Sequence, residues 1–435
     1  MRNHLSKVLI ITLLPLSTLA QDTITMSKQL LLEEVIKENK QIKIAAQGYE
    51  AAKAGYRQAN TIYLPNINFS YTAISTNLPL TAFGSKINQE AVTMADFNPD
   101  VINSPGHVQN FNTRIELQQP IFNFDAPYQR NAAKAQADAL QLKWQRTAEY
   151  IEMETGNAYM QLQMAYAVAD VLYDAKKTVL ANQKLVNDYY DNGLMQKSDV
   201  LNMQVRVLDI ENQIKYAQSN IANASEYINH LLHKTSPSAI IKPADTLSVN
   251  IENLQSMAIN ENRKDIAAMS KALEAHLYMA MAAQKKFLPR LNAFASYELN
   301  DKRLARFKGE GYMAGLQLTW NIFSGQRTKY SIQQANINRQ QAKEELDDYK
   351  SKTTLELSKT MRRLTDASNK IALTQQTLDQ SREAYRIRYN RYTQGLEKSS
   401  DLLNAEMQVT KIQLELKQAI LEYNITAAYL KFLTQ

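Results

Sequence analysis

Four segments of the chain alternate apolar and polar residues with a period of two. In the first of them, Ile67, Phe69 and Tyr71 alternate with Asn68 and Ser70. This alternation is typical of β-strands that have one apolar and one polar face. About nine to eleven residues is also the length with which a tilted strand crosses a bilayer. The pattern therefore predicts four membrane-length strands, at 66–75, 113–122, 291–299 and 312–322.

The rest of the chain follows helical periods. Apolar residues recur every seven positions at Leu172, Val179 and Val186, which is the spacing of a coiled-coil seam. Helices are expected over 27–61, 126–191, 251–286 and 327–393, and a further helix of about 32 residues is expected after each of the two long ones. A helix of about 66 residues extends roughly 100 Å, which is longer than a single globular domain requires.

The order of these elements occurs twice. Residues 193–202 and 395–404 are identical at six of ten positions, at a constant offset of 202. A repeat of this length makes each half of the protein one structural unit. We expect a first repeat over 21–232, a linker over 233–250 and a second repeat over 251–435. The first repeat holds an insertion at 77–112, which we expect to be a long extracellular loop.

Composition narrows the class of protein. Residues 1–20 have the basic start, the apolar middle and the small-residue end of a secretion signal. The chain has no cysteine, so disulfides, thiolate metal sites and lipidation of an N-terminal cysteine are excluded. No later segment is apolar for about 18 residues, yet a secreted chain also enters an outer membrane through alternating strands. The net charge of +7 is spread along the chain and indicates no anionic partner.

Four strands are too few to close a barrel, and unpaired strand edges are not tolerated in lipid. The chain is therefore expected to combine its strands with those of identical copies. Two copies give eight strands and a filled interior, whereas three give twelve and leave a lumen. The predicted fold is mainly helical with membrane β-structure, in which a trimeric 12-stranded outer-membrane barrel is continued by a long α-helical barrel.

With these features the sequence resembles the TolC family of outer membrane efflux proteins. The resemblance covers essentially all of the mature chain and rests on the duplicated element order, the Leu-Pro entries at Pro65 and Pro289, and the paired motifs at 193–202 and 395–404. It implies a homotrimer in the outer membrane of a Gram-negative bacterium, extending into the periplasm. It also implies two partners, a periplasmic adaptor (membrane fusion protein) and an inner-membrane transporter.

The function implied is that of a passive exit duct in a tripartite efflux pump. Two alternatives remain open. The same fold serves as the exit channel of type I protein secretion, and the sequence does not separate the two. A non-channel periplasmic coiled-coil scaffold is the alternative from another class, but it does not require four membrane-length strands.

The two repeated motifs are expected to form the tips of helical hairpins. Each glycine follows a long helix, where a left-handed residue often ends a helix. A serine is expected to cap each returning helix, with an aspartate in its first turn. Ending one helix and beginning the next is enough to explain these residues, with no further function. The resemblance adds a role in adaptor docking for Gly193, Leu194, Ser198, Asp199, Gly395, Leu396, Ser400 and Asp401.

The resemblance also points to a gate beside the second tip. Well-known members of the family have a tyrosine three residues before the second glycine, an arginine two after it, and aspartates six and nine after it. The corresponding residues here are Tyr392, Glu397, Asp401 and Asn404. The tyrosine and the first aspartate match, whereas the arginine is replaced by an acid and the second aspartate by an amide. A ring of three Asp401 carboxylates is expected to attract cations.

No enzyme is expected from this sequence. It has no phosphate-binding loop, catalytic triad or paired acid–base motif, and we expect no cofactor. His230 and His233 lack a third ligand and are interpreted as ordinary residues at a helix end rather than as a metal site. The arginines and tyrosines between Arg382 and Tyr392 are interpreted as a charged face beside a helical seam, not as a nucleic-acid site.

Overall fold

A computed structural model describes residues 23–234, 239–249 and 258–435, so the expected signal at 1–20 lies outside the described residues. In the first half the elements are β1 (Thr23–Met26), α1 (Lys28–Glu38), α2 (Lys40–Asn60), η1 (Thr61–Tyr63), β2 (Asn66–Thr76), α3 (Pro79–Asn88), η2 (Met94–Phe97), α4 (Pro99–Asn103), β3 (Val108–Phe122), α5 (Ala126–Asp191) and α6 (Lys197–Leu231). In the second half they are β4 (Ile240–Pro243), α7 (Lys264–Lys285), β5 (Arg290–Asp301), β6 (Gly309–Thr319), α8 (Arg327–Thr393) and α9 (Ser399–Thr434).

The chain divides into two units, each made of segments from both halves. One unit comprises Met1–Lys43, Ala148–Ile259 and Leu355–Gln435, and it contains both hairpin turns. The other comprises Ile44–Thr147 and Asn260–Thr354, and it contains the four long strands. Most residues are helical, and none of the helices in the described part of the chain combines the length and the apolar character that crossing a membrane requires.

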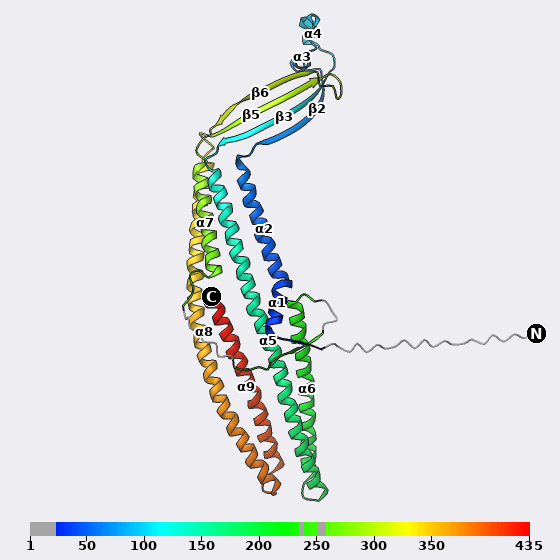
Figure 1. The fold of residues 1–435 in the computed structure, drawn as a ribbon, viewed down its shortest axis with the longest axis vertical. Coiled ribbons are helices and arrows are strands. Elements are labelled where there is room, and N and C mark those ends of the chain that lie inside the picture. Colours follow the sequence, from blue (N-terminus) through cyan, green and yellow to red (C-terminus); the bar gives the residue numbers. More distant parts are fainter. Residues whose placement is uncertain (1–22, 235–238, 250–257) are drawn as a thin grey trace, which may run out of the picture. The chain divides into compact units, whose positions relative to one another are not determined.

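The four long strands form one antiparallel sheet in the order β2-β3-β5-β6 (Figure 1). Because side chains alternate along a strand, the register gives the sheet one polar and one apolar face. Ser70, Arg114 and Glu298 lie side by side on the polar face. Phe69 and Leu316 lie on the apolar face, where they are 69% and 70% exposed. Strands β2 and β6 form the two edges, and no described strand of this chain pairs with their outer sides.

The strands lie where the alternation predicts them, but their ends differ, by a single residue in β2 and by more in the other three. Strand β6 begins at Gly309 instead of residue 312 and ends at Thr319 instead of 322. Its end is set by its partner, because β5 begins at Arg290, directly after Pro289, and pairs with Thr319. Strand β5 is longer than 291–299 at both ends, and β3 begins at Val108 instead of 113 because it pairs with β2 as far as Thr76.

The insertion expected to be a loop over 77–112 contains helices. Pro79 and Pro99 occupy the first turns of α3 and α4, where the fixed backbone angle of proline favours a helix start. The side chain of Asn98 caps α4 by accepting a hydrogen bond from the backbone N–H of Asp100 at 3.0 Å. The prediction of a loop over 77–112 is therefore incomplete, because it omits α3 and α4.

In the unit that contains the hairpin turns, the short strands β1 and β4 pair in parallel, although neither was predicted. The hydroxyl of Tyr159 on α5 donates to the backbone oxygen of Met26 at 3.2 Å and to the carboxylate of Asp245. It also accepts from the backbone N–H of Ala244 at 3.2 Å. Burial and the neighbouring carboxylate raise the pKa of Tyr159 to about 12. This buried hydroxyl therefore links β1 and the residues that follow β4 to the long helix. Of these two strands, β4 lies in the stretch predicted to be a linker.

Two predicted helices differ from the observed ones. The helix expected over 27–61 breaks at Asn39, whose side chain accepts from the backbone N–H of Gln41 at 2.9 Å and so begins α2 as a new helix. The helix expected over 251–286 begins at Lys264. Residues 251–257 lie outside the described part of the chain, and an Asx turn at Asn260 precedes the helix start.

Candidate functional site at the helical hairpin tips

The two hairpin turns have the same backbone geometry. Gly193 and Gly395 have φ values of +71° and +74°, in the left-handed region where an L side chain is strained. The N–H groups of Leu194 and Leu396 donate to the backbone oxygens of Tyr189 and Arg391, each at 2.9 Å. This closure satisfies carbonyl groups that the ends of α5 and α8 leave free. The glycines therefore end the helices as the sequence predicts.

The expected serine caps are wrong. The residues that cap α6 and α9 are Gln196 and Lys398, so Ser198 and Ser400 lie inside the first turns. Asp199, at the third position of α6, accepts the backbone N–H of Gln196 at 3.3 Å. An acid at this position closes the helix start in the manner of a capping box, so that no serine cap is needed.

The two tips contact each other through Asp199. The buried hydroxyl of Ser399, the first residue of α9, donates to the other carboxylate oxygen of Asp199. Asp199 thus bonds to its own helix start and to the second hairpin. The Tyr189 hydroxyl donates to the backbone oxygen of Thr393 at 3.0 Å, which is a second link between the two turns.

Tyr392 lies in the apolar core between the hairpins and is completely buried. Its ring lies 6.0 Å from that of Tyr189, and its hydroxyl lies 3.9 Å from the sulfur of Met195. Burial, together with the Asp199 charge, raises the pKa of Tyr392 to about 12. The other buried core residues around it come from the remaining three helices of the two hairpins, α5, α6 and α9: Val186, Val200, Met203, Leu402 and Leu403.

Glu397, which stands where the family has an arginine, is held by two arginines of its own hairpin. Its carboxylate accepts from Arg388 at 2.7 Å and from Arg391 at 2.9 Å. The Glu397 side chain is only 12% exposed, so these ion pairs hold the second turn against the end of α8.

The other two candidate gate residues lie in the first turns of α9. Asp401 is half-buried and Asn404 is exposed, and their spacing of three places them on neighbouring positions of the helix surface. Among the described residues, no side chain bonds to the Asp401 carboxylate, in contrast to that of Asp199. Leu194 and Leu396 project from the two turns and are 72% and 62% exposed.

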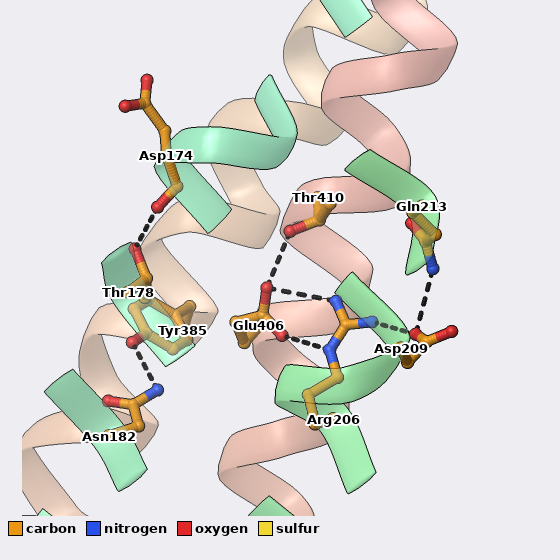
Figure 2. A network of polar contacts seen from close by, with 9 residues as sticks. All are labelled: Asp174, Thr178, Asn182, Arg206, Asp209, Gln213, Tyr385, Glu406 and Thr410. Carbon is orange, nitrogen blue, oxygen red and sulfur yellow. Dashed lines mark hydrogen bonds and ion pairs between the residues drawn. The ribbon is translucent and has the colours of Figure 1, made fainter. Parts of the chain in front are cut away.

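A buried ion pair between the hairpins was not predicted. Arg206 on α6 donates from Nε to Glu406 Oε2 on α9 at 3.0 Å and from Nη2 to Oε1 at 3.3 Å, as Figure 2 shows. The two side chains are only 8% and 3% exposed. Thr410 donates to Glu406 at 2.8 Å, and Asp209 accepts from Arg206 at 2.7 Å. Both members of the buried pair therefore have a further hydrogen-bond partner.

The sequence does carry a signal for this pair. Each charged residue stands within an otherwise apolar seam, three or four positions after Met203 and Leu402. A periodic pattern assigns the seam position to the nearest apolar residue, here Val207 on α6 and Ala405 on α9. In the structure these two residues are half-buried, and their neighbours Arg206 and Glu406 are the buried ones. Nearby, Asn182 donates to the Tyr385 hydroxyl at 3.2 Å and connects α5 to α8 (Figure 2).

No group of three metal-ligating side chains occurs within the described residues. His230 stacks against Tyr227 near the end of α6, and His233 lies beyond that helix with a positive φ of 56°. The site therefore consists of ion pairs, a buried aromatic cluster and exposed turns, an arrangement suited to holding helices together.

A family model described as outer membrane efflux protein matches residues 31–232 and 256–434, which is most of both halves. The chain belongs to the outer membrane efflux protein family. This confirms the resemblance and places the protein in the outer membrane, extending into the periplasm, as an exit duct for efflux or secretion. The two matched segments correspond closely to the two repeats.

Individual relatives are distant in sequence. The alkaline protease secretion protein AprF of Pseudomonas aeruginosa is 22% identical over 402 residues, which cover 90% of this chain and 81% of that protein. The crystal structure of CusC has a TM-score of 0.79 at 16% identity and covers 93% of this chain and 91% of its own. The outer membrane protein VceC of Vibrio cholerae has a TM-score of 0.77 at 18% identity, with 94% and 96% covered. The two solved structures establish the fold.

Proposed function

We propose that the protein is the outer-membrane channel of a tripartite efflux pump and that it acts as a homotrimer. The observation that carries this proposal is the sheet, which has one polar face, one exposed apolar face and two open edges. Open edges in lipid require partners, and identical copies supply them by pairing β2 of one chain with β6 of the next. Three copies form a 12-stranded barrel with a polar lumen, continued by a barrel of the long helices.

Native mass spectrometry of the detergent-extracted protein tests the assembly. The expected mass is three times that of the mature chain, and it should persist when the protein is diluted. A monomer, or a protein that stays in solution without detergent, would contradict the proposal. The second result would also favour the coiled-coil scaffold over the channel.

The hairpin tips are proposed to form the periplasmic entrance and to receive the adaptor. The exposed Leu194 and Leu396 offer apolar contacts to a partner helix, on turns that the glycines and Glu397 keep fixed. The docking set comprises Gly193, Leu194, Ser198, Asp199, Gly395, Leu396, Ser400 and Asp401. Transport through this duct is passive, and the inner-membrane transporter supplies the energy.

Within the entrance, we assign the constriction to Asp401. Its carboxylate is uncommitted among the described residues, so three copies form a ring of negative charge around the threefold axis. Replacing Asp401→Asn should lower the cation preference of the channel, measured from the reversal potential in a salt gradient. Asp199→Asn is the matched control, because that carboxylate is bonded at the helix start and to Ser399. An equal effect of both substitutions would contradict the assignment.

A specific observation favours protein export as a second candidate. The curated relative AprF is named for the secretion of alkaline protease. Deleting the gene for this protein separates the two functions. Loss of secreted proteins from the medium with unchanged drug susceptibility would support secretion, whereas raised drug susceptibility with an unchanged set of secreted proteins would support efflux.

A further inference from the structure

The insertion between β2 and β3 is much longer than their connection needs. Thr76 and Val108 are paired at the end of this hairpin, where a turn of about two residues would suffice. The opposite ends of the two strands lead to α2, through η1, and to α5. Since the helices extend into the periplasm, the insertion lies at the extracellular end of the sheet.

The insertion folds on itself as a compact element. Phe83 packs edge-to-face against Phe97 at 5.6 Å, and Lys86 forms an ion pair with Asp96 at 2.7 Å. Asp96 also accepts from the backbone N–H of Thr93 at 2.8 Å. Hydrogen bonds to Lys86 and Thr93 lower the pKa of Asp96 to about 2, so this link persists across physiological pH. The segment therefore has a defined shape.

The end of α3 is fixed to the polar face of the sheet. Gln89, which is only 3% exposed, donates to the backbone oxygen of Gln109 at 2.7 Å and to Asn110 Oδ1 at 2.9 Å. Asn110 in turn donates to Asn300 on β5 at 2.9 Å. Asn110 lies four residues before Arg114 on β3, and Asn300 lies two residues after Glu298 on β5, so both are on the polar face. The contact is thus a buried amide network.

A glycine on β6 confirms the direction in which the insertion folds. Gly309 pairs with Asn300, and a Cβ atom built on Gly309 would lie 2.1 Å from the backbone oxygen of Asn88. No side chain fits there while α3 keeps its place. Gly311, two residues along the same strand and on the same face, has nothing within 4 Å of such an atom. The end of α3 therefore rests directly on the backbone of β6.

We infer that residues 77–107 form a cap that folds inward over the extracellular mouth of the channel and limits the size of solutes that enter from outside. The inference rests on the proposed barrel, in which the polar face lines the lumen. An element fixed to the polar face lies on the lumen side of the barrel wall. A loop that leaned outward would instead contact the apolar face. Three caps, one from each chain, narrow the mouth together.

The test measures the size limit at this mouth. The native chain has no cysteine, so Ser70→Cys places a single thiol on the polar face of β2. Intact cells expressing this variant are treated with maleimide–polyethylene glycol reagents of graded mass. With the cap in place, small reagents should label the thiol and large ones should not. Leu80→Cys, at an 85% exposed position of the cap, should be labelled by all of them.

Two substitutions on β6 then form a matched pair. Adding Gly309→Val should displace α3 and admit larger reagents to Cys at position 70, whereas Gly311→Val should leave the size limit unchanged. A third variant replaces residues 79–105 by Asn-Gly and so removes α3 and α4 altogether. This variant should admit the largest reagents, whether or not Gly309→Val displaces α3. The trimer is checked in each variant by native mass spectrometry.

The outcomes separate the cap from the barrel. If reagents of every mass label position 70 equally in all variants, the channel stands and the cap is refuted. If even the smallest reagent fails to reach position 70 while Leu80→Cys is labelled, the polar face does not line an open lumen, and both the proposed barrel and the cap are refuted. A size limit that rises with Gly309→Val and with the Asn-Gly replacement, but not with Gly311→Val, is the result that the inference expects.

Discussion

At the scale of single residues, the Arg206–Glu406 ion pair is a buried polar link between the hairpins. Taking two charges out of water is costly, and only mutual bonding in good geometry offsets that cost. Here each partner has a further hydrogen bond. Glu406 accepts one from Thr410, and Arg206 donates one to Asp209. Such a pair contributes little net stability over an apolar replacement, but leaving either charge alone is severely destabilising.

Removing one member of this pair should therefore cost about 3–5 kcal/mol of unfolding free energy. We expect this loss for Arg206→Ala and for Glu406→Ala, measured by urea unfolding of the detergent-solubilised protein. The double change Arg206→Met with Glu406→Leu should recover most of it, because it leaves no buried charge unpaired.

The matched control lies on the same helix. Lys411 and Glu415 form an exposed pair at 3.9 Å, and Lys411→Ala should cost at most about 0.5 kcal/mol. If the double variant were as unstable as the sum of the two single ones, the stranded charge would not be the cause.

The pKa of Tyr392 makes a prediction for alkaline pH. Its ordinary value is 10.0 and burial raises it to about 12. Below pH 10 the side chain is neutral in both the folded and the unfolded protein, so its packing contributes fully. As the pH rises from 10 to 12, the unfolded protein loses this proton first, and stability falls.

Tyr392→Phe isolates this contribution. Near pH 8 it should change the free energy of unfolding by less than about 1 kcal/mol, because the hydrogen-bond partner of this hydroxyl within the described residues is the Met195 sulfur, at 3.9 Å. Between pH 10 and 12 the wild type should lose more stability than the variant, measured as the difference between their thermal midpoints. Parallel curves over this range would show that Tyr392 titrates like an exposed tyrosine.

At the scale of elements, the glycine position of each turn is constrained by its backbone conformation and not by neighbouring atoms. Nothing lies within 4 Å of a Cβ atom built on Gly193 or Gly395, so a side chain fits in space but not in dihedral angle. Gly395→Ala should cost about 1–2 kcal/mol, whereas Gly395→Asn should cost less, since asparagine tolerates the left-handed region. Both are measured by unfolding. Equal losses would point to a steric cause instead.

The helices and strands could be predicted well because their periods are repeated many times. Seven-residue spacing over α5 and α8 and alternation over β2 and β6 each rest on several positions. The ends of elements depend on single contacts that no period records. Strand β6 ends where its partner β5 begins, at Arg290, and α6 begins at Lys197, one residue before Ser198, because Asp199 closes its first turn.

The candidate site was harder to predict than the fold. The sequence identifies both turns through Gly193 and Gly395, but it does not show that Glu397 is bound by Arg388 and Arg391. It also does not show that Arg206 and Glu406, which are 200 positions apart, form an ion pair. Pairing of charges across two helices depends on their relative rotation, which a linear pattern leaves open.

At the scale of the whole molecule, duplication explains how one chain supplies four strands and two hairpins. The two repeats differ at the hairpin tips and in the connections between their strands. Asp199 is bound within the chain, whereas its counterpart Asp401 is uncommitted among the described residues. Likewise, of the two strand-to-strand connections, the one between β2 and β3 carries the inserted helices, whereas the one between β5 and β6 is short.

The central claim is that three chains enclose a continuous water-filled path. Planar-bilayer recording of the purified mature protein tests it most directly. We expect discrete current steps of uniform size, with a cation preference that Asp401→Asn lowers and Asp199→Asn leaves in place. A protein that inserts into the bilayer as a trimer and never conducts, either as the wild type or as the Asp401→Asn variant, would contradict the account.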